Sequence, residues 1–133
     1  MLNIARYIVA PYRFNGRDFS GCDCYGLVIL WFRHELNIEL IDHQHGRASH
    51  SEFTDTGYFT EKAHEEFSPV PIEDARLHDV VLIRTGSLTA NHCGIKLMGD
   101  CILHTMQKTG CITSKLSLWR NKIVGIYRHK GLK

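Results

Sequence analysis

The sequence predicts a single α+β domain in which one buried helix packs on an antiparallel sheet. The segment GLVILWFRHEL, residues 26–36, is dense in helix-compatible apolar residues. From Leu77 onward, short apolar runs alternate with glycine-containing turns, which is typical of an antiparallel meander. A length of 133 residues fits one domain covering 1–133, and 44% hydrophobic residues can supply its core.

The predicted helix begins beside Asp23, a residue type favoured at helix N-caps. Residues 27–32 are apolar on every side, which predicts a central, buried helix and not an amphipathic one. A fully buried strand is the alternative for so short an apolar run. We favour a helix because the next residues, 33–36, extend it smoothly.

The remaining elements follow from apolar runs and turn residues. The polar stretch from about Ile41 to Arg76, which includes His43, His45 and His50, predicts a loop with a short helix near 60–67. Glycine turns around residues 86, 99 and 110 separate the later runs. The predicted strands are 80–83, 92–97, 101–106, 111–113 and 123–128.

Charge and composition exclude several classes of protein. Sixteen basic and 14 acidic residues are too balanced for a nucleic-acid-binding surface. No apolar run approaches the roughly 20 residues needed to cross a bilayer, so membrane insertion is not expected. The N-terminus lacks a basic-then-apolar signal layout, which predicts synthesis in a cytoplasm. Five cysteines cannot all pair, and in such a compartment they are expected as free thiols.

Cys24 lies where chemistry is expected, at the start of the predicted helix. The free N–H groups and positive partial charge of a helix N-terminus stabilise a thiolate. The same N–H groups can bind the oxyanion that forms on an attacked carbonyl. This position therefore suits a nucleophile for acyl transfer.

A cysteine nucleophile also needs a base and a group that orients the base. His92 begins a predicted strand, and His104 lies on the next one across a tight turn. Strands joined by such a turn pair side by side, so His104 could reach His92. A structural histidine is the alternative for His104.

The same residues belong to a longer pattern that resembles the NlpC/P60 family. The family has an aromatic-glycine stretch before an Asp-Cys-Ser-Gly-Leu-Val motif, then a Gly-Asp-apolar strand, a His-x-Gly-Ile strand, a third polar site and a closing strand. The matching segments here run in the same order over nearly the whole chain: 11–16, 21–28, 79–82, 91–97, 102–104 and 124–128.

This resemblance implies a papain-like fold, peptidase activity and no cofactor. It assigns Cys24 as the nucleophile, His92 as the base and His104 as the group that orients it. Tyr12 matches the family tyrosine whose hydroxyl helps to form the oxyanion hole. The implied substrate is a peptidoglycan stem peptide, commonly cleaved after γ-D-glutamate.

Residues 24–28, 32–40 and 117–129 also resemble phage tail-tip members of the family, similar to the lambda tail assembly protein K. That resemblance implies tail-tip proteins as partners and a place in the virion tail after synthesis in the host cytoplasm. A tail-tip assembly protein with little turnover is the alternative function. A bacterial enzyme acting on another amide or on a thioester is a third.

The chain departs from the family pattern at three positions. Tyr25 stands where many members have serine, Asn15 replaces the first glycine of a pair, and His78 stands where glycine usually precedes the aspartate. Zinc binding is a further alternative for Cys22, Cys24, His92 and Cys93, but Cys22 and Cys24 lack the usual spacing of two to four residues between ligands. We therefore expect no metal.

Overall fold

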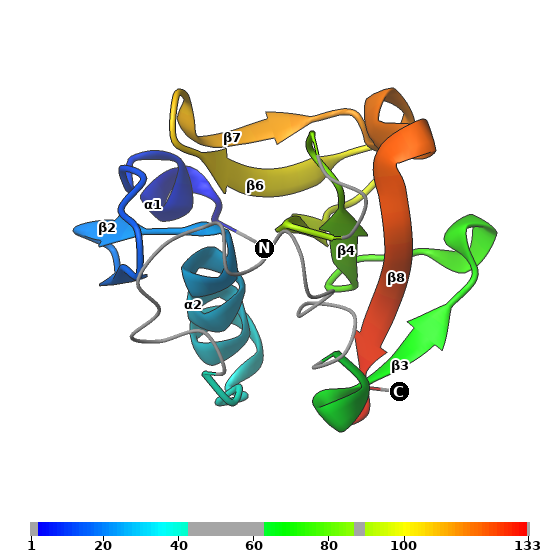
Figure 1. The fold of residues 1–133 in the computed structure, drawn as a ribbon. Helices are drawn as coiled ribbons and strands as arrows, with labels where there is room; N and C mark the ends of the chain where they lie inside the picture. The colour runs from blue at the N-terminus through cyan, green and yellow to red at the C-terminus, as the bar shows by residue number, and fades with distance from the viewer. Residues whose placement is uncertain (1–2, 43–62, 87–89, 133) are drawn as a thin grey trace.

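The structure is a computed structural model that describes residues 3–42, 63–86 and 90–132. The predicted loop containing His43, His45 and His50 lies outside these residues. The chain forms an α+β domain, as predicted, with a helix packed on an antiparallel sheet (Figure 1).

The central helix α2 spans Cys24–Leu36, so the helix prediction is confirmed and the strand alternative is wrong. Asp23 caps it by accepting a hydrogen bond from the Gly26 N–H at 2.8 Å. Asn37 ends it in the left-handed conformation, with φ at 56°. The apolar residues 27–32 are all buried, as their unbroken run predicts.

The sheet has six strands in the order β3-β8-β4-β5-β6-β7, with every neighbouring pair antiparallel. The strands are β3 Phe67–Val70, β4 Val80–Ile83, β5 His92–Lys96, β6 Ile102–Met106, β7 Gly110–Ser114 and β8 Ile123–His129. The predicted meander is correct from β4 to β7. It is wrong for β8, which returns across the sheet to pair with both β4 and β3.

Strand β3 was missed because its sequence, FSPV, lacks apolar alternation and contains Pro69. Proline cannot donate to a strand ladder, but it is tolerated at the edge of a sheet, and β3 is an edge strand. The short elements α1 Ala5–Ile8, β1 Arg17–Asp18, β2 Gly21–Cys22 and η1 Ile72–Asp74 were not predicted either.

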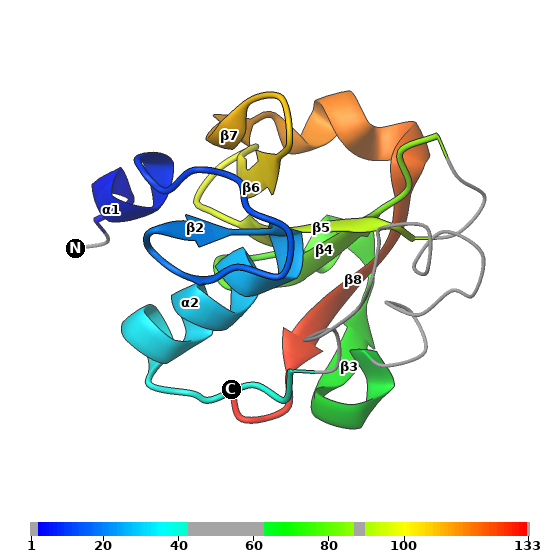
Figure 2. The same ribbon diagram turned by 60° about the vertical axis from the view of Figure 1, so that its left-hand side comes forward.

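Each face of the sheet is covered differently. Helix α2 lies against one face, where it contacts β5 and β6 and forms most of the core (Figures 1 and 2). The 3-10 segment η2, Leu116–Lys122, packs on the other face through Leu116 and Trp119 (orange in Figure 2). Among the described residues, no helix has the length and apolar character needed to span a membrane.

A buried ion pair joins Asp79, the residue before β4, to β8. The Asp79 carboxylate, which is fully buried, accepts hydrogen bonds from Arg128 Nε and Nη2, both at 2.8 Å. The Arg76 N–H donates a third at 2.9 Å. Three donors compensate for the removal of this carboxylate from water.

Candidate active site

Cys24 is the first residue of α2 and so stands at the positive end of the helix, where the first N–H groups have no partner within the helix. The first turn also needs Gly26, because a Cβ there would lie 2.1 Å from the Gly16 carbonyl oxygen. The loop through Gly16 can therefore cross directly over the start of the helix. This close approach explains why glycine follows the Cys24-Tyr25 pair.

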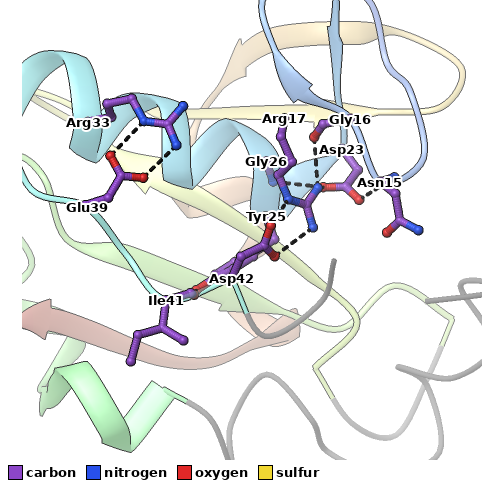
Figure 3. Close-up of polar contacts among 10 residues, drawn as sticks. All are labelled: Asn15, Gly16, Arg17, Asp23, Tyr25, Gly26, Arg33, Glu39, Ile41 and Asp42. Carbon is purple, nitrogen blue, oxygen red and sulfur yellow. Dashed lines mark hydrogen bonds and ion pairs between the residues drawn. The ribbon is translucent and has the colours of Figure 1, made fainter. Parts of the chain in front are cut away.

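The cap residue Asp23 is itself held by charge and hydrogen bonds (Figure 3). Its carboxylate accepts from the Asn15 N–H at 2.9 Å and from Arg17 Nη1 at 2.9 Å, in addition to the Gly26 N–H. Arg17 also reaches Asp42, with Nε 2.8 Å from one carboxylate oxygen. Burial raises the pKa of Asp23, as does Cys24, while Arg17 and the two N–H groups oppose this rise.

The two predicted histidines lie side by side. His92 Nε2 is 2.9 Å from His104 Nδ1, and both rings are buried. The register pairs Ile95 with Leu103, which places Gly94 beside His104. A Cβ on Gly94 would lie 3.0 Å from the His104 Cβ and 2.9 Å from the Leu103 oxygen. The glycine of the His-x-Gly pattern thus leaves room for the second histidine.

The surroundings of Cys24 favour a thiolate. Hydrogen bonding from the Cys93 thiol, from His92 and from the Cys93 N–H lowers the pKa of Cys24 well below the usual thiol value, although burial opposes this. Burial raises the pKa of Cys93, and the neighbouring Cys24 raises it further. Cys93 therefore stays protonated as a donor, a role beyond the packing role that its strand position predicted.

The histidine pair continues to two residues that the sequence did not assign to the site. His104 Nε2 is 2.8 Å from Ser114 Oγ, and Trp119 Nε1 donates to the same oxygen at 2.9 Å. Burial, followed by the charge of His92, lowers the pKa of His104 to about 4. His104 is therefore neutral at neutral pH.

Tyr12 lies near the predicted nucleophile, in an isolated bridge with Cys22. Burial and the charge of Cys24 raise the pKa of Tyr12, so its hydroxyl keeps its proton and can donate. A cleft of about 250 Å³ opens here. Its lining includes Tyr12, Cys24, Thr85, Asn91, His92 and Gln107.

Asn91 holds the rim of this cleft beside His92. Its Oδ1 accepts from the Thr85 N–H at 2.7 Å, and its Nδ2 donates to the Thr85 oxygen at 2.9 Å. These bonds fix the chain just before the predicted base. Asparagine at a strand start gave no signal of this role in the sequence.

The three residues that depart from the family pattern lie in well-defined surroundings. Asn15 and His78 both have positive φ, 60° and 81°, where glycine is the residue of least strain. His78 is additionally held by Trp31, whose Nε1 donates to His78 Nδ1 at 3.0 Å. Tyr25 turns its hydroxyl to the Ile41 oxygen at 2.6 Å (Figure 3).

All five cysteines are free. In the described part of the chain, no group of three or more histidine, cysteine or acidic side chains could hold a metal.

The domain is thus an α+β domain in which a helix packed on an antiparallel sheet begins at a cysteine beside a pair of histidines. The model of the NlpC/P60 family matches residues 9–128. The chain therefore belongs to the NlpC/P60 family of cysteine hydrolases. No curated protein sequence matches the chain closely enough to count as a relative.

Solved structures agree on the fold. The NlpC/p60 domain of the peptidoglycan hydrolase SagA superposes with a TM-score of 0.62 at 16% identity, covering 92% of this chain and 90% of that one. A lipoprotein-like member from Staphylococcus aureus has a TM-score of 0.65 at 20% identity, covering 93% and 38%. A family member from Bacillus cereus has a TM-score of 0.66 at 13% identity, and the match covers 92% of this chain and 36% of that one. The chain thus spans little more than a third of the latter two.

Proposed function

We propose that this chain is a cysteine peptidase or amidase that cleaves peptide bonds in peptidoglycan stem peptides. The observation that carries the proposal is that Cys24, at a helix N-terminus, and His92 line one cleft, with His104 bonded to His92 behind it. Family membership and the fold shared with a peptidoglycan hydrolase domain support the substrate class.

The proposed reaction begins with attack of the Cys24 thiolate on the substrate carbonyl carbon. The Cys24 backbone N–H and the Tyr12 hydroxyl hold the resulting oxyanion. His92, as the imidazolium, protonates the leaving amine as the carbon–nitrogen bond breaks. Water, deprotonated by His92, then cleaves the thioester and frees the carboxylate product and Cys24.

Incubation of purified protein with muropeptides, followed by mass spectrometry, tests this function. Wild-type protein should shorten the stem peptides, whereas Cys24→Ala and His92→Ala should leave them intact. Cys101→Ala is the matched control, because it removes a thiol that lies outside the cleft lining. Uncleaved stem peptides with wild-type protein would refute the proposal.

We further propose that the hydrolase acts from a phage tail tip, where it would open the host cell wall for DNA entry. The resemblance of residues 24–28, 32–40 and 117–129 to tail-tip members supports this setting. The alternative of a tail-tip assembly protein draws support from one observation: only 7% of Cys24 is exposed. A thiol so enclosed is compatible with a site kept closed in the tail.

Phage particles carrying Cys24→Ala distinguish the two roles. For a wall hydrolase, the particles should assemble normally but deliver DNA poorly through intact wall. Failure of assembly, or infection equal to wild type, would favour the assembly role.

A further inference from the structure

The row of hydrogen bonds behind the candidate base extends to the far side of the sheet. Ser114 pairs with Ile102, and His104 pairs with Ile112, so Ser114 and His104 are diagonal neighbours on one face of β6 and β7. Segment η2 then turns Trp119 over this face. Its ring lies edge-to-face against His104, with centroids 5.5 Å apart and an interplanar angle of 86°.

The direction of these bonds follows from which atoms can donate. An indole N–H only donates, so Ser114 Oγ must accept from Trp119 Nε1. In the active ion pair, His92 carries a proton on both ring nitrogens, so His104 Nδ1 must accept from His92 Nε2. The single proton of a neutral His104 then sits on Nε2 and is donated to Ser114 Oγ.

A serine hydroxyl can satisfy this arrangement in both states of His92. Its oxygen has two acceptor sites, which take the Trp119 and His104 protons together when His92 is charged. When His92 becomes neutral and keeps its proton on Nδ1, the His104 proton moves to Nδ1. The Ser114 hydroxyl can then donate to His104 Nε2, while Trp119 still occupies one acceptor site.

We propose that Ser114 and Trp119 are positioning residues that hold the His104 proton on Nε2, so that Nδ1 accepts from the His92 imidazolium. They act through His104 and do not touch the substrate. The contribution to catalysis rests on the proposed function, whereas the effect on the two histidines does not.

Loss of the Ser114 hydroxyl should therefore weaken the charged form of His92. In Ser114→Ala, the Nε2–H form of His104 loses its acceptor, and the other tautomer would point a proton at His92 Nε2. The other titratable groups nearby are Cys24 on α2, Cys93 on β5 and Lys122, whose Nζ lies 5.7 Å from the Trp119 ring centre. None of them can replace the lost acceptor for His104 Nε2.

The variants separate a positioning role from a structural one. Ser114→Ala removes the hydroxyl, Ser114→Thr keeps it, and Trp119→Phe removes only the N–H donor from an aromatic ring. Ser117→Ala is the matched control, because Ser117 lies in η2 but bonds to Asp100.

The first readout is nitrogen-15 NMR of the histidine rings between pH 5 and 10. In wild type, we expect His104 protonated on Nε2 whenever His92 is charged. In Ser114→Ala, that preference should be lost, and His92 should give up its proton about one pH unit lower, the size of a hydrogen bond to a charged group. Trp119→Phe should shift His92 in the same direction by less. Ser114→Thr and Ser117→Ala should match wild type.

The second readout is muropeptide cleavage as a function of pH. Ser114→Ala should shift the alkaline limb of the kcat/KM profile to lower pH by the same amount. Above neutral pH, its activity should be about tenfold lower than that of wild type. Unchanged histidine signals in folded Ser114→Ala and Trp119→Phe would overturn the inference, as would a Thr variant as impaired as the Ala variant. If wild type cleaves nothing, the proposed function fails, while the NMR result still decides this inference.

Discussion

The low pKa of the fully buried His104 predicts a specific loss of stability in mild acid. An unfolded histidine takes up a proton near pH 6.5, whereas folded His104 does so only near pH 4. Between these values the unfolded chain binds more protons, so the free energy of unfolding falls as the pH drops. At pH 5, about 1.5 units below the unfolded value, the loss from this residue is about 2 kcal/mol.

The perturbation that isolates this effect is His104→Asn, which removes the titrating group and keeps a polar side chain. Urea unfolding, followed by tryptophan fluorescence at pH 7 and pH 5, gives the free energy of unfolding for each protein. The variant should lose about 2 kcal/mol less than wild type between the two pH values. The exposed His64, replaced by Asn as a control, should leave the wild-type pH dependence unchanged.

Equal losses between pH 7 and pH 5 for wild type and His104→Asn would refute this reasoning. Such a result would mean that His104 takes up its proton in the folded protein as readily as in the unfolded one. The neutral histidine on which the direction of the hydrogen bonds depends would then be lost as well.

Three further outcomes are expected. Iodoacetamide at mildly acidic pH should alkylate Cys24 faster than the more exposed Cys101, because the surroundings of Cys24 lower the pKa of its thiol, and faster labelling of Cys101 would contradict the thiolate. Arg128→Met should lower the free energy of unfolding, measured in urea, by about 3–5 kcal/mol, because it leaves the buried Asp79 carboxylate without its cationic partner. Adding Asp79→Asn should recover part of that cost, and no recovery would argue against the ion pair. Tyr12→Phe should lower kcat on the order of a hundredfold if its hydroxyl binds the oxyanion, with folding intact by circular dichroism; full activity would remove Tyr12 from the site.

The helix and the later strands could be predicted because their signals are local. Asp23 precedes an unbroken apolar run, and glycines mark the turns of the meander. The position of β8 could not be predicted in this way. It depends on pairing with β4 and β3, which lie far away in sequence. An apolar run in the sequence does not indicate which other strand it pairs with.

The same difference between local and long-range signals applies to the residues of the candidate site. Cys24, His92 and His104 were found because their residue types and their positions at element ends suit the chemistry. Ser114 and Trp119 were missed, because a serine at the end of a strand and a tryptophan in a short helical turn have many structural uses. Their role depends on the diagonal register of β6 and β7 and on the turn into η2.

The place of β8 in the sheet has a consequence for the order in which the protein matures. This strand follows all the other described strands in the chain, yet it lies between β3 and β4. During translation, the ribosome releases Cys24 long before the residues that complete the sheet. The lowered pKa of the Cys24 thiol depends on His92 and Cys93. Both lie on β5, which pairs with β4, and β8 flanks β4 on its other side. The thiol therefore gains its acidity only when β5 lies beside α2.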